Sequence, residues 1–331
     1  MKKIVSLVLC FVTLCASMLI VGCRENNVIR LSEVTHSTFY APLYVAINNG
    51  YFEEEELEIQ LTSGEGADKV MASITSNSVD VGFCGPEAVI YCKVNGQKNH
   101  PLVFAQLTKR DGAFLVSKEN ISNFSWNDLI GKRVLAGRKG GVPAMTFQYV
   151  LNQNGIQLNQ LNFDTSVAFA NMAGVFQADE SVDFTTLFEP TASEVVANGK
   201  GYIVASIGVE SGEIPYTVFC SSKNFIEKNP DKVKKFIRAL IKGVNYVKTN
   251  DALTVATALA PSFGGISIEG LKTTIESYVI IDAWSSSPVM NETAFNRLQD
   301  VMENAGELSS RVNFSDIVDN TYASEVFAEF N

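Results

Sequence analysis

The sequence has little of the residue types on which many enzymes and small secreted domains depend. Its 331 residues include two histidines and two tryptophans, and its six cysteines show no Cys-x-x-Cys spacing. Scarce histidine argues against a His-based catalytic triad or a zinc site. With nine prolines and no low-complexity tract, the chain is not expected to be disordered or collagen-like. A folded protein is expected, with neither metal nor cofactor.

Positive charge is also in short supply. Lysine and arginine number 26 against 36 aspartates and glutamates, giving a net charge of −10 and a pI of about 4.9. Nucleic acids are bound largely through lysine and arginine, so we expect no nucleic-acid partner. Single hydrophobic cores stop growing near ~250–300 residues, and the length therefore favours two lobes.

The N-terminus has the composition of an export signal. Met1-Lys2-Lys3 precedes an uncharged apolar run from Ile4 to Val21, as in signal peptides. The run ends in Leu19-Ile20-Val21-Gly22-Cys23, which resembles the lipobox of bacterial lipoproteins. We therefore expect a signal peptide over 1–22, lipid attachment at Cys23 and a linker over 23–27. The alternative, an uncleaved membrane anchor, also places the remainder outside the cytoplasm.

Only three cysteines would remain in the processed chain. Cys84, Cys92 and Cys220 cannot all pair with one another. The simpler interpretation is that they are small buried apolar side chains. A bridge between Cys84 and Cys92 is the alternative.

The hydrophobic pattern after Cys23 alternates between the periods of strands and helices. Repeated strand–helix units predict an α/β fold with a mostly parallel sheet. The predicted strands are 28–33, 57–61, 79–83, 102–107, 113–117, 133–136, 162–164, 183–188, 202–205 and 217–221. An amphipathic helix follows Asn229-Pro230, and from there the chain is mainly helical. We detect no internal repeat.

Several segments together resemble the periplasmic-type substrate-binding proteins for nitrate, sulfonates, taurine and thiamine precursors. The first is His36-Ser37-Thr38-Phe39-Tyr40-Ala41-Pro42-Leu43-Tyr44, followed by Gly50-Tyr51-Phe52 and Leu57-Glu58-Ile59. The others are 79–87, 128–134, 182–183 and Phe188-Glu189-Pro190. The likeness extends from about residue 28 to 250. Glu56 stands where this family usually has glycine, so we expect the helix before it to end without a left-handed glycine cap.

This resemblance implies a fold of the type II periplasmic binding protein class, with two α/β lobes, a ligand cleft between them and a helical C-terminal region. It implies lobe 1 over 28–108 and 216–331 and lobe 2 over 109–215, with crossings near 108–114 and 215–220. The implied partners are a small-molecule ligand, the permease and ATPase subunits of an ABC transporter, and a membrane held through the lipid anchor. A monomer is expected.

Ligands in open α/β sheets bind beyond the carboxyl ends of strands, and this rule selects the candidate residues. The first loop contributes Ser37 and Thr38, whose hydroxyls either bind a polar ligand or only cap the next helix. Phe39 is expected to stack on a planar ligand. Tyr40 is also a candidate, although its place on the apolar stripe favours the core.

The second loop contributes Cys84, Gly85 and Glu87. Glycine lets the backbone approach a ligand closely, whereas Glu87 either contacts the ligand or complements the helix dipole. Gly64 is a further candidate at the end of another strand. Its surroundings fail the dinucleotide-binding fingerprint, because Lys69 stands in place of the third glycine.

The remaining candidates lie in the second lobe and at the first crossing. Arg138, Gly140, Gly141 and Val142 combine positive charge, glycine and a helix start, which suits an anion; Arg138 is otherwise a solvated surface residue. Glu189 either accepts hydrogen bonds from the ligand, caps the next helix or forms salt bridges. Thr108 completes the set of expected ligand contacts.

These features favour a lipid-tethered receptor that closes two lobes around a small polar organic nutrient and delivers it to an importer. One alternative is an enzyme of the same fold, resembling pyrimidine synthases or menaquinone-pathway enzymes. Gly-x-Ser-x-Gly and the cysteine-rich segment of the pyrimidine synthases are both missing from the sequence, and an exported protein lacks cytoplasmic cofactors. A ligand sensor that acts with a partner in trans is the other alternative.

Overall fold

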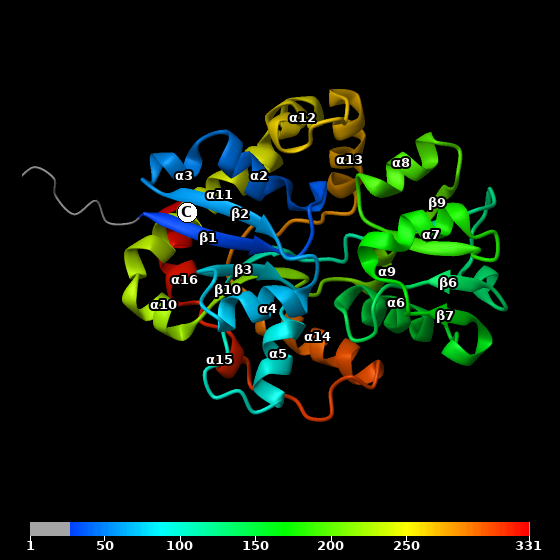
Figure 1. Ribbon diagram of the computed structural model, residues 1–331, viewed down its shortest axis with the longest axis horizontal. Helices are drawn as coiled ribbons and strands as arrows, with labels where there is room; N and C mark the ends of the chain where they lie inside the picture. The colour runs from blue at the N-terminus through cyan, green and yellow to red at the C-terminus, as the bar shows by residue number, and fades with distance from the viewer. Residues whose placement is uncertain (1–26, 331) are drawn as a thin grey trace, which may run out of the picture.

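The computed structural model describes residues 27–330, so the expected signal peptide and lipid-attachment residue Cys23 lie outside the described residues. Two five-stranded sheets form two α/β lobes that lie side by side (Figure 1). This arrangement confirms the predicted fold class of two α/β lobes.

The first lobe is built on a sheet with strand order β2-β1-β3-β10-β4. Its strands β1, β2 and β3 are parallel, while β10 runs antiparallel to both β3 and β4. The bounds are β1 Val28–Glu33, β2 Glu58–Ser63, β3 Val81–Cys84, β4 Leu102–Thr108 and β10 Thr217–Ser221.

The second lobe repeats this plan with strand order β7-β6-β8-β5-β9. Strands β6, β7 and β8 are parallel, and β5 runs antiparallel to β8 and β9. The bounds are β5 Phe114–Ser117, β6 Arg133–Leu135, β7 Asn162–Asp164, β8 Phe184–Leu187 and β9 Tyr202–Ser206. The expectation that the chain has no internal repeat is therefore wrong at the level of structure. The repeat lies in the order of the strands, which composition does not reveal.

Helices cover the sheets and fill the connections between strands. In the first lobe they are α2 Ala41–Asn48, α3 Tyr51–Glu54, α4 Ala67–Thr75 and α5 Glu87–Val94, and in the second lobe α6 Val142–Gln153, α7 Met172–Ala178, α8 Thr191–Ala197 and α9 Ile207–Ser211. After β10 follow α10 Lys223–Lys228, α11 Pro230–Thr249, α12 Ala252–Leu259, α13 Ile268–Ile280, α14 Glu292–Asn304, α15 Phe314–Ile317 and α16 Thr321–Phe327. Short 3₁₀ turns are η1 Thr38–Tyr40, η2 Trp126–Leu129, η3 Leu158–Gln160, η4 Phe169–Asn171, η5 Ala260–Ser262 and η6 Ala328–Phe330.

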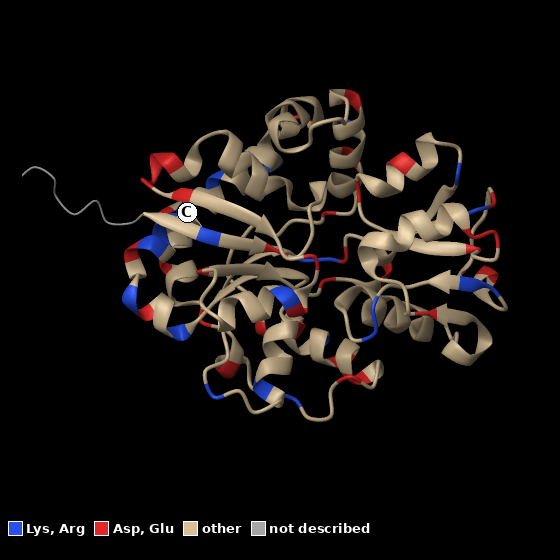
Figure 2. Ribbon diagram, in the orientation of Figure 1, with Lys and Arg blue, Asp and Glu red and all other residues tan. Residues whose placement is uncertain are grey.

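The amphipathic helix predicted after Asn229-Pro230 is α11, and its apolar stripe is buried. Val233, Phe236 and Leu240 are each at most 1% exposed, as expected for positions that recur on one helical face. Lys and Arg positions lie close to Asp and Glu positions at this end of the first lobe (Figure 2). There Lys242 forms ion pairs with Glu54 at 2.9 Å and Glu55 at 2.8 Å, which tie α11 to α3.

Glu56 adopts φ +58° at the end of α3, so the helix ends without a left-handed glycine cap, as expected. Leu57 N–H then donates to the Phe52 carbonyl at 2.8 Å, so the left-handed turn is formed by a residue with a side chain. Pro86 is the N-cap of α5, which begins at Glu87.

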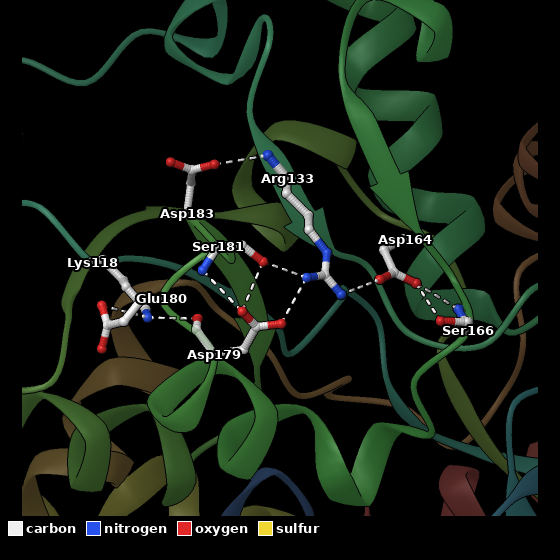
Figure 3. Close-up of polar contacts among 8 residues, drawn as sticks. All are labelled: Lys118, Arg133, Asp164, Ser166, Asp179, Glu180, Ser181 and Asp183. Atoms are coloured by element: carbon white, nitrogen blue, oxygen red, sulfur yellow. Dashed lines mark hydrogen bonds and ion pairs between the residues drawn. The ribbon is translucent and has the colours of Figure 1, made fainter.

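In each lobe one aspartate, Asp80 or Asp183, forms hydrogen bonds with an arginine of the neighbouring strand. These contacts lie at the end of each sheet that is farthest from the other lobe. In the first lobe Asp80 accepts hydrogen bonds from the Arg30 backbone N–H at 2.9 Å and from its guanidinium. In the second lobe Asp183 accepts from the Arg133 backbone N–H at 2.9 Å (Figure 3). The guanidinium of Arg133 instead pairs with Asp164 and Asp179.

All three cysteines of the described region are free thiols, so the alternative of a Cys84–Cys92 bridge is not formed. Cys84 and Cys220 are fully buried on the neighbouring strands β3 and β10, which agrees with the simpler interpretation. None of the helices within residues 27–330 has the length and apolar character needed to cross a membrane.

Candidate functional site

The loops at the carboxyl ends of β1 and β3 face those of β6 and β8 across the boundary between the lobes. Ser37 Oγ donates a hydrogen bond to the Glu189 carbonyl oxygen at 2.5 Å, which joins residues 152 positions apart. Ser37 also caps η1 by accepting from the Phe39 N–H at 3.1 Å. The loops selected by the strand-end rule therefore meet in space, and Ser37 performs the capping role as well as contacting the other lobe.

Phe39 lies at the centre of an aromatic cluster between the lobes. Its side chain is fully buried, and its ring centroid lies 5.2 Å from Phe188 and 5.8 Å from Tyr216. Tyr278 of α13 contributes a third ring at 5.0 Å. The Phe39 ring also packs so closely on Gly112 that a Cβ added there would lie 2.8 Å from it. Phe39 thus faces side chains from both lobes and both crossing segments.

Side chains around this cluster carry buried polar atoms that have no hydrogen-bond partner within the described residues. Such atoms are rare in folded proteins because desolvation without a partner costs about 1–3 kcal/mol each. They come from both lobes and from the two crossing segments: Thr38 Oγ1, Glu87 Oε2, Arg110 Nε, Asp111 Oδ2, Thr146 Oγ1, Thr185 Oγ1, Thr186 Oγ1 and Tyr216 Oη. Each of these groups has hydrogen-bonding capacity that the described residues do not use.

Glu87 is the candidate whose environment is most unusual. It is 3% exposed, and burial raises its pKa to about 7, although the Arg138 guanidinium and nearby backbone N–H groups act in the opposite direction. Its carboxylate folds back over Gly85, where an added Cβ would lie 2.0 Å from Glu87 Oε2. Gly85 is therefore required for this conformation, which is a more specific reason than close approach of a ligand.

A groove of about 430 Å³ opens between the lobes beside Glu87. Its walls include Glu87, Tyr91 and Cys92 from α5 and Arg138 and Gly140 from the second lobe. The Tyr91 hydroxyl donates to the Gly140 carbonyl at 3.0 Å across this boundary. The groove leads from solvent to the buried carboxyl of Glu87.

Arg138 and Glu189, both expected to contact ligand, have protein partners in this conformation. The Arg138 guanidinium lies 3.2 Å from the Asp68 carboxylate of the first lobe and remains about half exposed. Glu189 is fully buried, and its carboxylate accepts from the Ser193 N–H and hydroxyl, both at 2.8 Å. Arg138 thus takes part in an interlobe ion pair, a role that the sequence did not suggest, whereas Glu189 takes the expected capping role at α8.

The other candidates lie at or near the same boundary. Gly141 is the N-cap of α6 and Val142 is its first residue, while Thr38 and Tyr40 are buried in η1. Thr108 Oγ1 accepts from the Thr217 N–H at 2.9 Å, so it joins the strands of the two crossings. A Cβ added at Gly64 would lie 2.7 Å from a methyl carbon of Val70, so the close packing at this position requires glycine.

Sequence reasoning missed Asp111 and Tyr216, one on each crossing segment. Asp111 is fully buried and Tyr216 is 4% exposed. Burial raises the pKa of Asp111 to about 8, and burial together with the neighbouring Asp111 carboxyl raises the pKa of Tyr216. The predicted crossings near 108–114 and 215–220 were the available signal, because polar residues within them lie beside the cleft.

Comparison with known proteins decides the family. The NMT1/THI5-like family model matches residues 37–252. The chain belongs to this family. A Bacillus subtilis protein named "Putative binding protein YtlA" is 38% identical over 312 residues, covering 93% of each chain. A more distant family relative is the 4-amino-5-hydroxymethyl-2-methylpyrimidine phosphate synthase of Aspergillus parasiticus, 26% identical over 66% of each chain.

Solved structures support the same fold. The alkanesulfonate-binding protein SsuA of Xanthomonas axonopodis pv. citri aligns with a TM-score of 0.73 at 16% identity, covering 90% of this chain and 100% of that one. The nitrate-binding protein NrtA of Synechocystis aligns with a TM-score of 0.70 at 14% identity, covering 93% and 90%. This member of the NMT1/THI5-like family therefore has the periplasmic binding protein fold.

Proposed function

We propose that this protein is the extracytoplasmic solute-binding component of an ATP-driven importer and captures a small polar organic molecule between its two lobes. The observation that carries the proposal is the set of unpartnered buried polar atoms at the lobe boundary. A ligand that supplies their partners favours the closed arrangement over the open one, and closure then reports occupancy to the permease.

The proposed division into lobes follows the strands of the two sheets. Residues 109–215 form lobe 2, and 28–108 with 216–331 form lobe 1, so the segments around 109–113 and 212–216 act as hinges. Strands β4 and β10 of the first sheet and β5 and β9 of the second adjoin these segments. Two short connections allow the lobes to move as rigid bodies.

Anchoring and partners follow from the sequence and from the relatives. We propose lipid attachment at Cys23, which tethers a monomer to the outer side of the cell membrane near the permease and ATPase. Binding proteins for an alkanesulfonate and for nitrate share the fold, which supports transport. The sensor alternative shares the binding step and differs only in the partner that recognises closure.

An enzymatic function is the second candidate, because pyrimidine phosphate synthases are relatives at 26% identity or less. The 38% identical relative is named a binding protein, which favours binding without turnover. Nanomolar to micromolar capture corresponds to about 8–12 kcal/mol. A few charge-assisted hydrogen bonds and one aromatic contact are of the right order for this value.

The test uses the full chain purified in detergent and five probes: nitrate, ethanesulfonate, taurine, 4-aminopyridine and 4-amino-5-hydroxymethyl-2-methylpyrimidine. We expect at least one probe to raise the melting temperature and to bind with 1:1 stoichiometry in calorimetry, unchanged after incubation. A ligand at 100 times its Kd adds about 2.7 kcal/mol to stability. Consumption of the probe would instead favour the enzyme.

Variants locate the site. Arg138→Ala and Glu189→Ala should each weaken binding about tenfold, because the first removes an interlobe ion pair and the second frees the loop that Ser37 contacts. Asp128→Asn, in the η2 turn of the second lobe, is the control and should bind normally. Unchanged affinity in both test variants would place the ligand elsewhere.

A further inference from the structure

Asp111 is a buried carboxyl on the first crossing segment with one oxygen unused. Its Oδ1 accepts the Ala113 N–H at 2.7 Å, whereas Oδ2 is buried and has no hydrogen-bond partner within the described residues. An unpaired carboxyl in such a place is costly to keep. Its retention at the lobe boundary points to a partner that arrives from outside the chain.

Tyr216, on the return crossing, supplies a second unused group beside it. Its hydroxyl is buried without a partner, and the carboxyl of Asp111 acts on it electrostatically. The Tyr216 ring lies 5.8 Å from Phe39 and 6.2 Å from Phe188. The two polar groups therefore adjoin the aromatic cluster that lies between the lobes.

No positive charge of the described chain compensates Asp111. The groups that counteract the effect of burial on its pKa are the Ala113 N–H and the Tyr216 hydroxyl. The neighbouring Arg110 places its guanidinium 3.7 Å from Glu213, although its Nε has no hydrogen-bond partner within the described residues. Arg138, the cation of the groove, lies against Asp68. Both cations near the site thus lie against carboxylates of the chain.

We propose that Asp111 and Tyr216 together bind a hydrogen-bond-donating nitrogen of the ligand, either an ammonium, an amino group or a ring N–H. Asp111 Oδ2 accepts from this nitrogen, and the Tyr216 hydroxyl provides a second acceptor or donor beside it. A bare anion such as nitrate or an alkylsulfonate is disfavoured there, because it has no N–H group to donate to Asp111 Oδ2. This inference rests on the proposed function and names the ligand class for the same site.

The position of the pair also links recognition to closure. Asp111 and Tyr216 belong to different crossing segments, so a nitrogen held by both fixes one hinge geometry. In the described structure the two groups act on each other but have no hydrogen bond of good geometry, and a ligand that supplies one removes that cost. Differential affinity for the closed state is the condition under which a ligand drives closure.

The test compares the five probes above on the full chain in detergent at pH 7.5, using calorimetry. We expect 4-aminopyridine or the aminopyrimidine to bind and nitrate and ethanesulfonate not to bind. Asp111→Asn, which keeps the shape and the acceptor for Ala113, should lower the affinity about 10- to 100-fold, and Tyr216→Phe about 3- to 10-fold. Asp128→Asn is the matched control and should retain wild-type affinity.

Each other outcome overturns the inference. Unchanged affinity of Asp111→Asn for a nitrogen probe would show that the carboxyl does not recognise it. Binding of nitrate or ethanesulfonate but of neither nitrogen probe would refute the ligand class and leave the proposed function intact. No response to any probe would count against both. The melting temperature of each free variant shows whether it is folded, and a value near that of wild type is expected for Asp111→Asn, which keeps the acceptor for the Ala113 N–H.

Discussion

The two lobes share one strand order but differ in how each uses a glutamate at its facing edge. In the first lobe the glutamate follows the proline, as Pro86-Glu87, and Glu87 Oε2 has no partner within the described residues. In the second lobe it precedes the proline, as Glu189-Pro190, and both carboxylate oxygens accept hydrogen bonds from Ser193. Glu87 therefore keeps an unsatisfied carboxylate oxygen, whereas both carboxylate oxygens of Glu189 are used in hydrogen bonds within the protein.

The difference teaches that the place of an acid relative to a helix start decides its availability. Glu189 stands before α8, so its side chain reaches forward to the N–H of the first turn, as capping residues do. Glu87 is the first residue of α5, and its side chain instead turns back over Gly85. Similar short motifs in the two lobes therefore lead to an unsatisfied carboxylate oxygen in one and a helix-capping carboxylate in the other.

Removal of the Phe39 ring, which contacts both lobes, should lower the unfolding free energy more than any of the substitutions that follow. Phe39→Ala leaves a cavity among Phe188, Tyr216 and Tyr278, and we expect a loss of about 3–5 kcal/mol in unfolding free energy. Urea denaturation measures it. Phe147→Ala, which alters the core of the second lobe alone, is the control. X-ray scattering of the ligand-free protein should show a larger radius of gyration for Phe39→Ala than for the control, and equal radii would contradict an interlobe role.

Exchange of each glutamate for glutamine separates the two kinds of acid. The folded pKa of Glu87 is about 7, above its ordinary value of 4.5, so the folded state holds its proton more tightly. The stability contributed by this group is complete below pH 4.5 and is lost as pH rises through 7, by about 1.4 kcal/mol per pH unit. Glu87→Gln should therefore be more stable than wild type at pH 8 and similar at pH 4.

Glu189→Gln loses one of the two acceptors that Ser193 uses. Burial raises the pKa of Glu189, although the Ser193 hydrogen bonds act in the opposite direction. We therefore expect a loss of about 1 kcal/mol at pH 4 and a smaller loss at pH 8, where wild type carries the disfavoured buried charge. Thermal unfolding between pH 4 and 8 measures both variants. The Asp111 carboxyl titrates equally in all three proteins and cancels in the differences. Equal stability changes in the two glutamine variants would erase the distinction between the lobes.

The aspartate contacts at the far ends of the two sheets should contribute unequally to the free energy of unfolding. Asp80→Asn breaks the contacts of Asp80 with the backbone and guanidinium of Arg30, and Asp183→Asn breaks contacts with Arg133 N–H and Lys132. Asp80 is 18% exposed and Asp183 is 36% exposed. Losses of about 2 and about 1 kcal/mol are expected in urea denaturation. A larger loss for Asp183→Asn would reverse the ranking.

The turns that end α3 and α6 offer the smallest test. Glu56 and Gly155 both have positive φ, +58° and +76°, and each is followed by a residue whose N–H closes the helix. Glu56→Gly should raise the melting temperature by about 1–3 °C by relieving the left-handed strain. Gly155→Ala should lower it by a similar amount. Lys235→Met controls for the Glu56 ion pair, and a fall in melting temperature for Glu56→Gly would show that this pair dominates.

The sequence predicted the fold well where periodicity was strong. The strands at 162–164 and 217–221 have the predicted bounds, and α11 buries the predicted stripe. Hydrophobic patterns of period 2 and period 3.6 follow directly from which residues are buried, so strands and helices can be predicted from them without knowledge of tertiary contacts. The repeat of the two lobes was missed, because its sequence trace is as short as Ser78-Val79-Asp80 beside Ser181-Val182-Asp183.

The candidate site was predicted only in outline. The strand-end rule selected loops that meet in space, but the contact of Ser37 with Glu189 joins residues 152 positions apart and has no local signal. The side-chain conformation in which Glu189 accepts hydrogen bonds from Ser193 likewise depends on the folded backbone. Asp111 was overlooked because a single polar residue between two strands has neither periodicity nor a motif. Its burial emerges only when α9 and Tyr216 are placed around it.

The link between Ser37 and residue 189 has a consequence for variation among relatives. Ser37 donates to a main-chain carbonyl, an atom that every amino acid supplies. Substitution at 189 changes the side chain at this position and leaves the acceptor itself in place, whereas the donor exists only while a hydroxyl occupies position 37. This hydrogen bond therefore restricts the side chain at position 37 and not the one at position 189, which is restricted only by its own contacts with Ser193.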